Sequence, residues 1–160
     1  YRTMEAPGRG RGDGPAVGLS GTSIRPYRAT DLPALAHLDA AATGEDRAHL
    51  LAALATPEGT RVAVGADDRP QGFLVRPPWG GGATIAPDPD VAMAILEARR
   101  DVYPVDRKVR GGVLDRNDRG LARLDAAGWT EAWRAPRMER GAPLDWDPGA
   151  IWGQFNHALG

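Results

Sequence analysis

One stretch in the second half of the chain constrains the fold more than any other. Residues 109–137 contain a short apolar strand, the turn Asp115-Arg116-Asn117, a compact helix, Gly128-Trp129 and a second strand. Asn favours a helix N-cap because its side chain accepts a hydrogen bond from a free N–H of the first turn. Gly favours the position just after a helix. This order of strand, helix and strand is typical of a sheet that carries helices on its faces.

The rest of the chain adds elements of the same kind. Apolar runs predict further strands at 24–28, 61–65, 71–76, 83–86, 108–114, 129–138 and 150–156. Apolar residues at helical spacing predict helices from Thr30 to Gly44, over 45–55, from Asp88 with Pro89 at its first position to 101, and over 118–127. The fold class predicted is α+β, a three-layer arrangement in which a mixed, largely antiparallel sheet is flanked by helices.

The domain boundary is predicted after residue 23. Residues 1–23 contain the run Gly-Arg-Gly-Arg-Gly-Asp-Gly-Pro, which is too rich in glycine to pack and is typical of a linker. Its Arg-Gly alternation and its Arg-Gly-Asp tripeptide are too short to indicate RNA binding or adhesion. Residues 24–160 are expected to form one domain with a single core.

Composition narrows the setting in which the protein works. Lys and Arg total 20, Asp and Glu total 21, and the net charge of −1 gives no reason to expect nucleic acid or an anionic membrane as a partner. The absence of cysteine excludes disulfides and thiolate nucleophiles. No apolar run reaches the ~20 residues of a membrane span, so we expect a cytoplasmic protein.

Several chemistries are excluded by the residues themselves. The two serines, Ser20 and Ser23, both lie in the predicted linker, and no Gly-x-Ser-x-Gly elbow exists. His37, His49 and His157 are isolated from one another, so no metal site is expected. No Walker loop and no dinucleotide-binding glycine fingerprint is present.

The strand that leads into Asn117, the helix after it and the Gly128-Trp129 pair resemble the GNAT acyltransferase superfamily, over residues 24–160. The resemblance implies an acetyl-CoA-dependent transfer of acetyl to a small-molecule or peptide amine, with the oxyanion held by N–H groups of a strand. It also implies that a strand carries the acyl-CoA, which makes Phe73, Val75 and Asn117 the expected cofactor contacts. A CoA-like ligand is expected between strands 71–76 and 83–86.

A narrower set of residues resembles the C-terminal domain of bacterial proteins that carry two GNAT domains in tandem. The set comprises Leu38-Asp39, Gly44, Asp46-Arg47, the turn at 85–87, Arg137-Met138, Gly141 and residues 151–160. Under this resemblance, residues 1–6 look like the last strand of a preceding domain. The implied partner is a second GNAT domain or a second copy of the chain.

The sequence departs from the family pattern at two places. The loop that binds pyrophosphate should expose backbone N–H groups before the main helix, yet Ala86-Pro87-Asp88-Pro89-Asp90 supplies two prolines and two carboxylates there. The tyrosine that serves the family as general acid falls near Leu124, which cannot donate a proton. The alternative to an active transferase is therefore a degenerate GNAT-fold domain without CoA binding, serving substrate recognition or dimerisation.

Individual candidates each have a functional and a structural interpretation. Asp115 is the candidate general base, or a turn carboxylate. Asn117 is a pantetheine contact or a helix cap. Asp39 and Arg47 are candidates for a substrate pocket, or a structural salt bridge. Trp79, beside three glycines, is the tryptophan expected at a cleft, and small-molecule binding around it is a third possible function.

Overall fold

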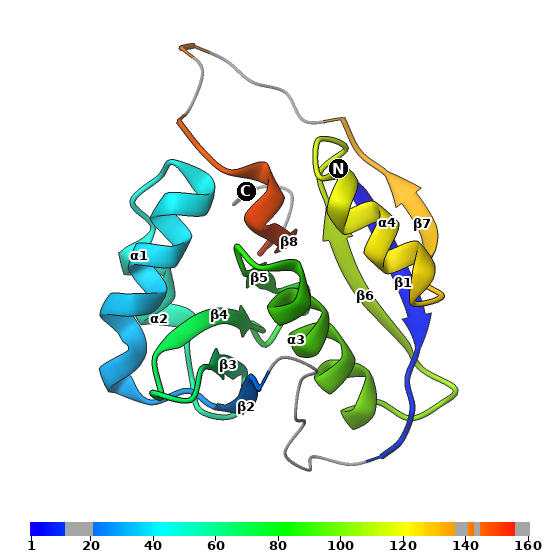
Figure 1. The fold of residues 1–160 in the computed structure, drawn as a ribbon, viewed down its shortest axis with the longest axis horizontal. Coiled ribbons are helices and arrows are strands. Elements are labelled where there is room, and N and C mark those ends of the chain that lie inside the picture. Colours follow the sequence, from blue (N-terminus) through cyan, green and yellow to red (C-terminus); the bar gives the residue numbers. More distant parts are fainter. Residues whose placement is uncertain (12–20, 137–140, 143–144, 156–160) are drawn as a thin grey trace.

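The computed structural model describes residues 1–11, 21–136, 141–142 and 145–155. They form two sheets with helices packed on them (Figure 1). The strands are β1 (Arg2–Pro7), β2 (Ser23–Pro26), β3 (Thr60–Val64), β4 (Pro70–Val75), β5 (Ala83–Ile85), β6 (Lys108–Val113), β7 (Thr130–Arg134) and β8 (Ile151–Gly153). The helices are α1 (Leu32–Thr43), α2 (Ala48–Leu54), α3 (Pro89–Val102) and α4 (Asp118–Ala126), with short 3₁₀ turns η1 (Ala29–Asp31) and η2 (Pro148–Ala150).

The larger sheet has the strand order β2-β3-β4-β5-β8, and it includes the predicted hairpin of β3 and β4. Side chains alternate between its two faces, as the strand period requires. Val62, Phe73 and Ile85 lie in the core cluster beneath α1 and α2. Ala63 and Leu74 lie in the cluster beneath α3. One buried sheet therefore separates two apolar cores.

The smaller sheet has the order β6-β1-β7, with the N-terminal strand at its centre. Met4 and Ala6 are buried in the same cluster as Trp129. Of the two predictions for residues 1–23, a linker or a strand of a preceding domain, Arg2–Pro7 therefore fit the strand and not the linker. A six-residue strand followed by a Gly-rich run carries little local signal, and its partners lie more than a hundred residues away. Its origin in a preceding domain stays a prediction, and residues 12–20 lie outside the described residues.

The helix boundaries follow the predicted caps in most places. The Asp88 carboxylate accepts the backbone N–H of Asp90 at 2.7 Å at the start of α3, and Gly44 ends α1 in the left-handed region with φ of 72°. Thr30 is not a cap, because it lies within η1, where the Asp31 carboxylate accepts the backbone N–H of Arg28 at 2.7 Å. Helix α2 begins at Ala48 instead of residue 45.

The closing strands are shorter than predicted within the described residues. Strand β7 covers Thr130–Arg134 and β8 covers Ile151–Gly153, while the predicted ends at 138 and 156 lie outside the described part of the chain. Every strand pairing among the described residues is antiparallel. The α+β class is confirmed, with two antiparallel sheets in place of one mixed sheet.

Among the helices of the described residues, none combines the length and the apolar character that a membrane crossing requires.

Candidate functional site

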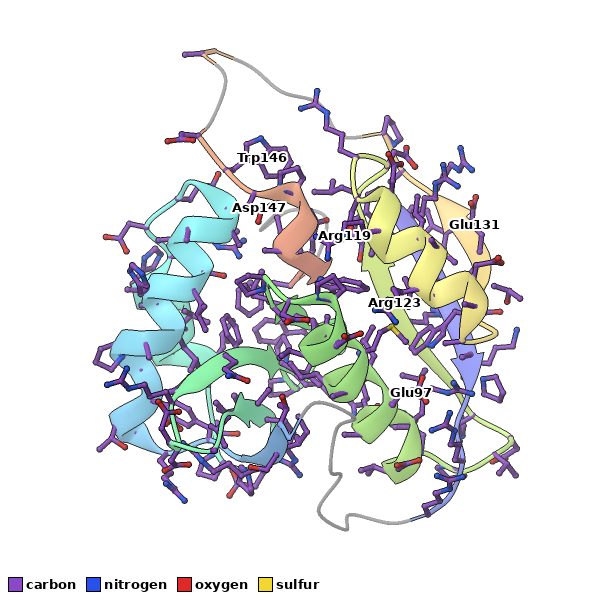
Figure 2. The ribbon with its side chains drawn as sticks, in the orientation of Figure 1. Glu97, Arg119, Arg123, Glu131, Trp146 and Asp147 are labelled. Atoms are coloured by element: carbon purple, nitrogen blue, oxygen red, sulfur yellow. The ribbon has the colours of Figure 1, made fainter. Side chains whose placement is uncertain are left out.

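The N-terminus of α3 is occupied by its own side chains. Asp88 accepts the N–H of Asp90, and Pro89 has no N–H to offer. The Asp90 carboxylate forms an ion pair with Arg123 of α4 at 2.7 Å, and Figure 2 shows Arg123 between the two helices. The helix dipole favours an anion here, but two carboxylates already hold that position. This end of α3 is poorly suited to a pyrophosphate.

Strand β5 is hydrogen-bonded along both of its edges. On one side it pairs with β4, so a ligand cannot lie between these two strands, and the expected cofactor position between 71–76 and 83–86 is wrong. On the other side it pairs with β8, Thr84 opposite Gly153 and Ile85 opposite Ile151. Backbone pairing on both edges leaves little of strand β5 open to an acyl group.

The contacts continue beyond the two paired residues. Gly82 donates its N–H to the Gln154 carbonyl at 3.2 Å, and Ala86 donates to the Ala150 carbonyl at 2.9 Å. The indole Nε1 of Trp152 donates to the Ala86 carbonyl at 3.2 Å, and this indole is fully buried. Five residues at the chain's described C-terminal end therefore cover the whole length of β5.

Strand β8 lies in the gap between the two sheets (Figure 1). It pairs with β5 and packs beside β6, which belongs to the other sheet. Gly153 is needed at this point, because a Cβ there would lie 2.6 Å from the Gly82 carbonyl oxygen. The chain itself thus fills the gap that the sheets leave open.

Asn117 follows β6 and begins α4, as predicted. Its Oδ1 accepts the N–H of Gly120 at 2.7 Å, and its Nδ2 donates to the Gly149 carbonyl at 3.1 Å. The side chain is buried, with 3% of the residue exposed. The helix-cap interpretation is confirmed, and the second bond ties η2 to α4. Contact between Asn117 and a pantetheine arm stays a prediction, and both polar groups of its side chain already have partners.

Asp115 is exposed at the end of β6 and forms an ion pair with Arg2 of β1. The hydrogen bond from the Arg2 guanidinium holds the pKa of the Asp115 carboxyl below its usual value. A carboxylate with a lowered pKa is ionised at neutral pH, but it is a weak proton acceptor. Its role as general base stays a prediction.

Asp115 borders a hollow of about 300 Å³, and one of the residues beside it there was not predicted as a site residue. Tyr1 lies on the same wall, and burial raises the pKa of its phenol to about 12, against the opposing effects of a backbone hydrogen bond at Gln154 and the charge of Arg99. The remaining lining residues are Leu114, Arg116, Ala135, Pro136 and Trp146. Pairing between β1 and β6 brings Tyr1 here, and no local pattern could have shown it.

Asp39 and Arg47 form a buried ion pair. The Asp39 carboxylate accepts from Arg47 Nε at 2.9 Å and from Nη2 at 2.7 Å, and both side chains are at most 7% exposed. The Arg47 guanidinium also lies over the Phe155 ring, 5.4 Å from its centre. The salt-bridge interpretation is confirmed. Substrate binding by this pair stays a prediction, and its fork is already engaged.

The remaining candidates lie apart from these residues. Phe73 and Val75 are fully buried beneath α1, so a cofactor could reach only their backbone, and that backbone belongs to a paired strand. Trp79 is 60% exposed in the loop before β5. Trp129 and Trp152 are buried. No group of His, Asp and Glu side chains in the described ranges is placed to hold a metal ion.

The two sheets, the helices on their faces and the Asn-capped α4 define a GNAT-type domain. The family of acetyltransferase (GNAT) domains matches residues 35–153, and the chain belongs to this family. The fold resembles the crystal structure of a protein from Pyrococcus horikoshii assigned as an acetyltransferase, with a TM-score of 0.66 and 21% sequence identity. The similarity covers 100% of this chain and 52% of that protein, so the chain spans about half its length. No curated protein sequence matches the chain.

Proposed function

We propose that this domain takes part in the acetyl-CoA-dependent N-acetylation of a small-molecule or peptide amine without itself binding the cofactor. It would serve substrate recognition or dimerisation beside a cofactor-binding GNAT domain. The observation that carries this proposal is the pairing of β8 along β5, which uses the strand N–H groups that an acyl-CoA needs.

The start of α3 supports the same proposal. The backbone N–H of Asp90, in the first turn, already donates to the Asp88 carboxylate. The Asp90 carboxylate adds a second negative charge within that turn. Bringing a pyrophosphate to this point would place like charges together with few donors to offset them. Both halves of a CoA site, the strand and the helix terminus, are therefore closed by the domain's own residues.

The proposed companion is a second GNAT domain. The similar P. horikoshii protein is about twice as long as this chain, which leaves room for one. Strand β1 supplies a further argument, because residues 1–6 resemble the last strand of a preceding domain and lie at the centre of the smaller sheet. A strand shared in this way would join two domains firmly.

Calorimetric titration with acetyl-CoA tests the proposal. We expect no saturable heat and no thermal shift at about 1 mM cofactor, which corresponds to a Kd weaker than about 1 mM. Size-exclusion chromatography with light scattering should show a stable assembly, either of two copies or with the companion domain. A monomer that binds acetyl-CoA at micromolar concentration would overturn the proposal.

A second candidate function is acetyl transfer by this domain, and the hollow shared by Asp115 and Tyr1 favours it. In this mechanism the amine nitrogen attacks the acetyl carbonyl, Asp115 accepts the amine proton, and the CoA sulfur leaves with a proton from the Tyr1 phenol. Asp115→Asn should then remove most turnover and leave CoA affinity nearly unchanged. Unchanged turnover in this variant would retire the assignment.

A further inference from the structure

A separate pocket lies at the other end of α3 from the closed cofactor site. It has a volume of about 420 Å³ and lies between the C-terminal half of α3 and strands β2, β3 and β4. Helix α3 has 14 residues, so at 1.5 Å per residue its two ends are about 20 Å apart. The pocket is within the size range of small-molecule sites, about 300–1,000 Å³.

The floor and one wall of this pocket are apolar. Ile24 and Leu74 come from the sheet, and Ile95, Ala98 and Val102 come from successive turns of α3. Val102, at the end of the helix, is 46% exposed. An apolar group in this pocket would remove that surface from water.

The rim carries two arginines that share one aromatic ring. The guanidinium of Arg76 lies 5.0 Å from the centre of the Tyr103 ring, and that of Arg99 lies 5.9 Å from it. Neither arginine forms an ion pair among the described residues. Glu58, the acidic residue of the lining, is exposed and pairs with neither of them. Two cations are thus held together without a counter-charge.

Arg99 also has an unused donor. Its Nη1 donates to the Arg110 carbonyl at 2.8 Å, but its Nε is buried and has no acceptor. Burial lowers the pKa of this guanidinium, Tyr103 opposes that effect, and the charge of Arg76 adds to it. Buried donors in proteins normally have partners. An anion beside the outer nitrogens of Arg99 would supply the charge that this guanidinium lacks.

The other two arginines of the lining differ in this respect. Arg25 forms two hydrogen bonds of 2.8 Å with Asp31 and one of 2.9 Å with Asp68. Arg61 donates to backbone carbonyls, including those of Pro57 and Glu58. The side chains of Arg25 and Arg61 are therefore engaged with other groups of the protein. Arg76 and Arg99, the other two arginines of the lining, lack an acidic partner among the described residues.

We propose that this pocket binds a small organic carboxylate with an apolar body. The apolar body would lie against Ile24, Leu74 and Ile95, and the carboxylate would lie between Arg76 and Arg99. Guanidinium groups bind planar carboxylates well, because their N–H donors match the spacing of the two oxygens. This site requires neither acetyl-CoA nor a companion domain, so it stands independently of the proposed function.

The test uses 2-naphthoate as probe and 2-naphthamide as its uncharged analogue of the same shape. Calorimetry on the full chain should give a Kd for 2-naphthoate on the order of 0.1 mM, and at least tenfold weaker binding of 2-naphthamide. Arg76→Met and Arg99→Met should each weaken 2-naphthoate binding about tenfold or more. Arg69→Met is the matched control, since Arg69 is 85% exposed outside the pocket and its loss changes the net charge equally. It should leave binding unchanged.

If Arg99→Met unfolds, Arg76→Met still decides the test, because the Arg76 side chain is exposed and its substitution leaves the backbone hydrogen bond from Arg76 to Gly59 in place. Equal affinity for 2-naphthoate and 2-naphthamide would overturn the proposal, since it would show an apolar hollow with no use for charge. Undiminished binding to Arg76→Met would overturn it as well. So would the absence of any binding to the unaltered chain.

Discussion

At the scale of single residues, the buried Asp39–Arg47 ion pair is the feature of the fold that we expect to tolerate substitution least. Removing one partner of a buried ion pair leaves the other charge uncompensated, which typically costs about 3–5 kcal/mol of stability. We predict that Asp39→Asn lowers the free energy of unfolding by about this amount, measured by urea denaturation. Asp67→Asn, which removes the partner of exposed Arg69, is the matched control and should cost less than about 1 kcal/mol. Equal losses in both variants would contradict the assignment.

Asp31 should make the stability of the fold depend on pH. Its hydrogen bonds from Arg25, and then from the Arg28 N–H, hold the pKa of this carboxyl below its ordinary value of 3.8. A lowered pKa in the folded state means that the stabilisation is complete above 3.8 and is lost as the pH falls through the folded-state value. We predict that the stability lost between about pH 5 and about pH 3 is smaller in Asp31→Asn than in the unaltered chain. An identical acid dependence of unfolding would contradict this role.

At the scale of elements, the position of β8 beside β5 depends on glycine at residue 153. A Cβ at Gly153 would meet the Gly82 carbonyl oxygen at 2.6 Å, so Gly153→Ala must shift β8 away from β5. We predict a loss of about 1–3 kcal/mol and faster hydrogen exchange of the Ala86 amide. Gly111→Ala is the control in β6, where the nearest atom lies at an ordinary 3.4 Å. Gly153→Ala with normal exchange at Ala86 would show that β8 is not held as described.

Elements with local signals were predictable from sequence, and elements with remote partners were not. Asp88-Pro89 starts α3 and Asn117 starts α4, because each side chain bonds the turn that follows it. The pairing of β1 was not predictable, although residues 1–6 resembled a strand, because its partners in β6 and β7 are remote in sequence. The pocket at Arg76 and Arg99 was missed for the same reason, since β4 and α3 meet there only after folding.

At the scale of the whole molecule, the domain has the GNAT fold, and under our proposal its own segments cover the surfaces where a cofactor would bind. The β8 segment fills the gap between the two sheets, and Asp88 and Asp90 close the start of α3. The chain can therefore match the GNAT family and still lack a phosphate-binding loop, because Asp88 and Asp90 stand where that loop would be. It also places the open arginine pocket at the opposite end of α3, where ligand binding would not compete with β8.

The most direct test of the closed cofactor site is a backbone NMR titration of the chain with acetyl-CoA. The amide signals of Thr84, Ile85 and Ala86 report on the edge that β8 covers, and those of Asp90 and Val91 report on the start of α3. We predict no saturable shift in any of them up to about 1 mM acetyl-CoA. Saturable shifts that converge on Thr84–Ala86 and on the first turn of α3 would show that the cofactor displaces β8, and would contradict the account.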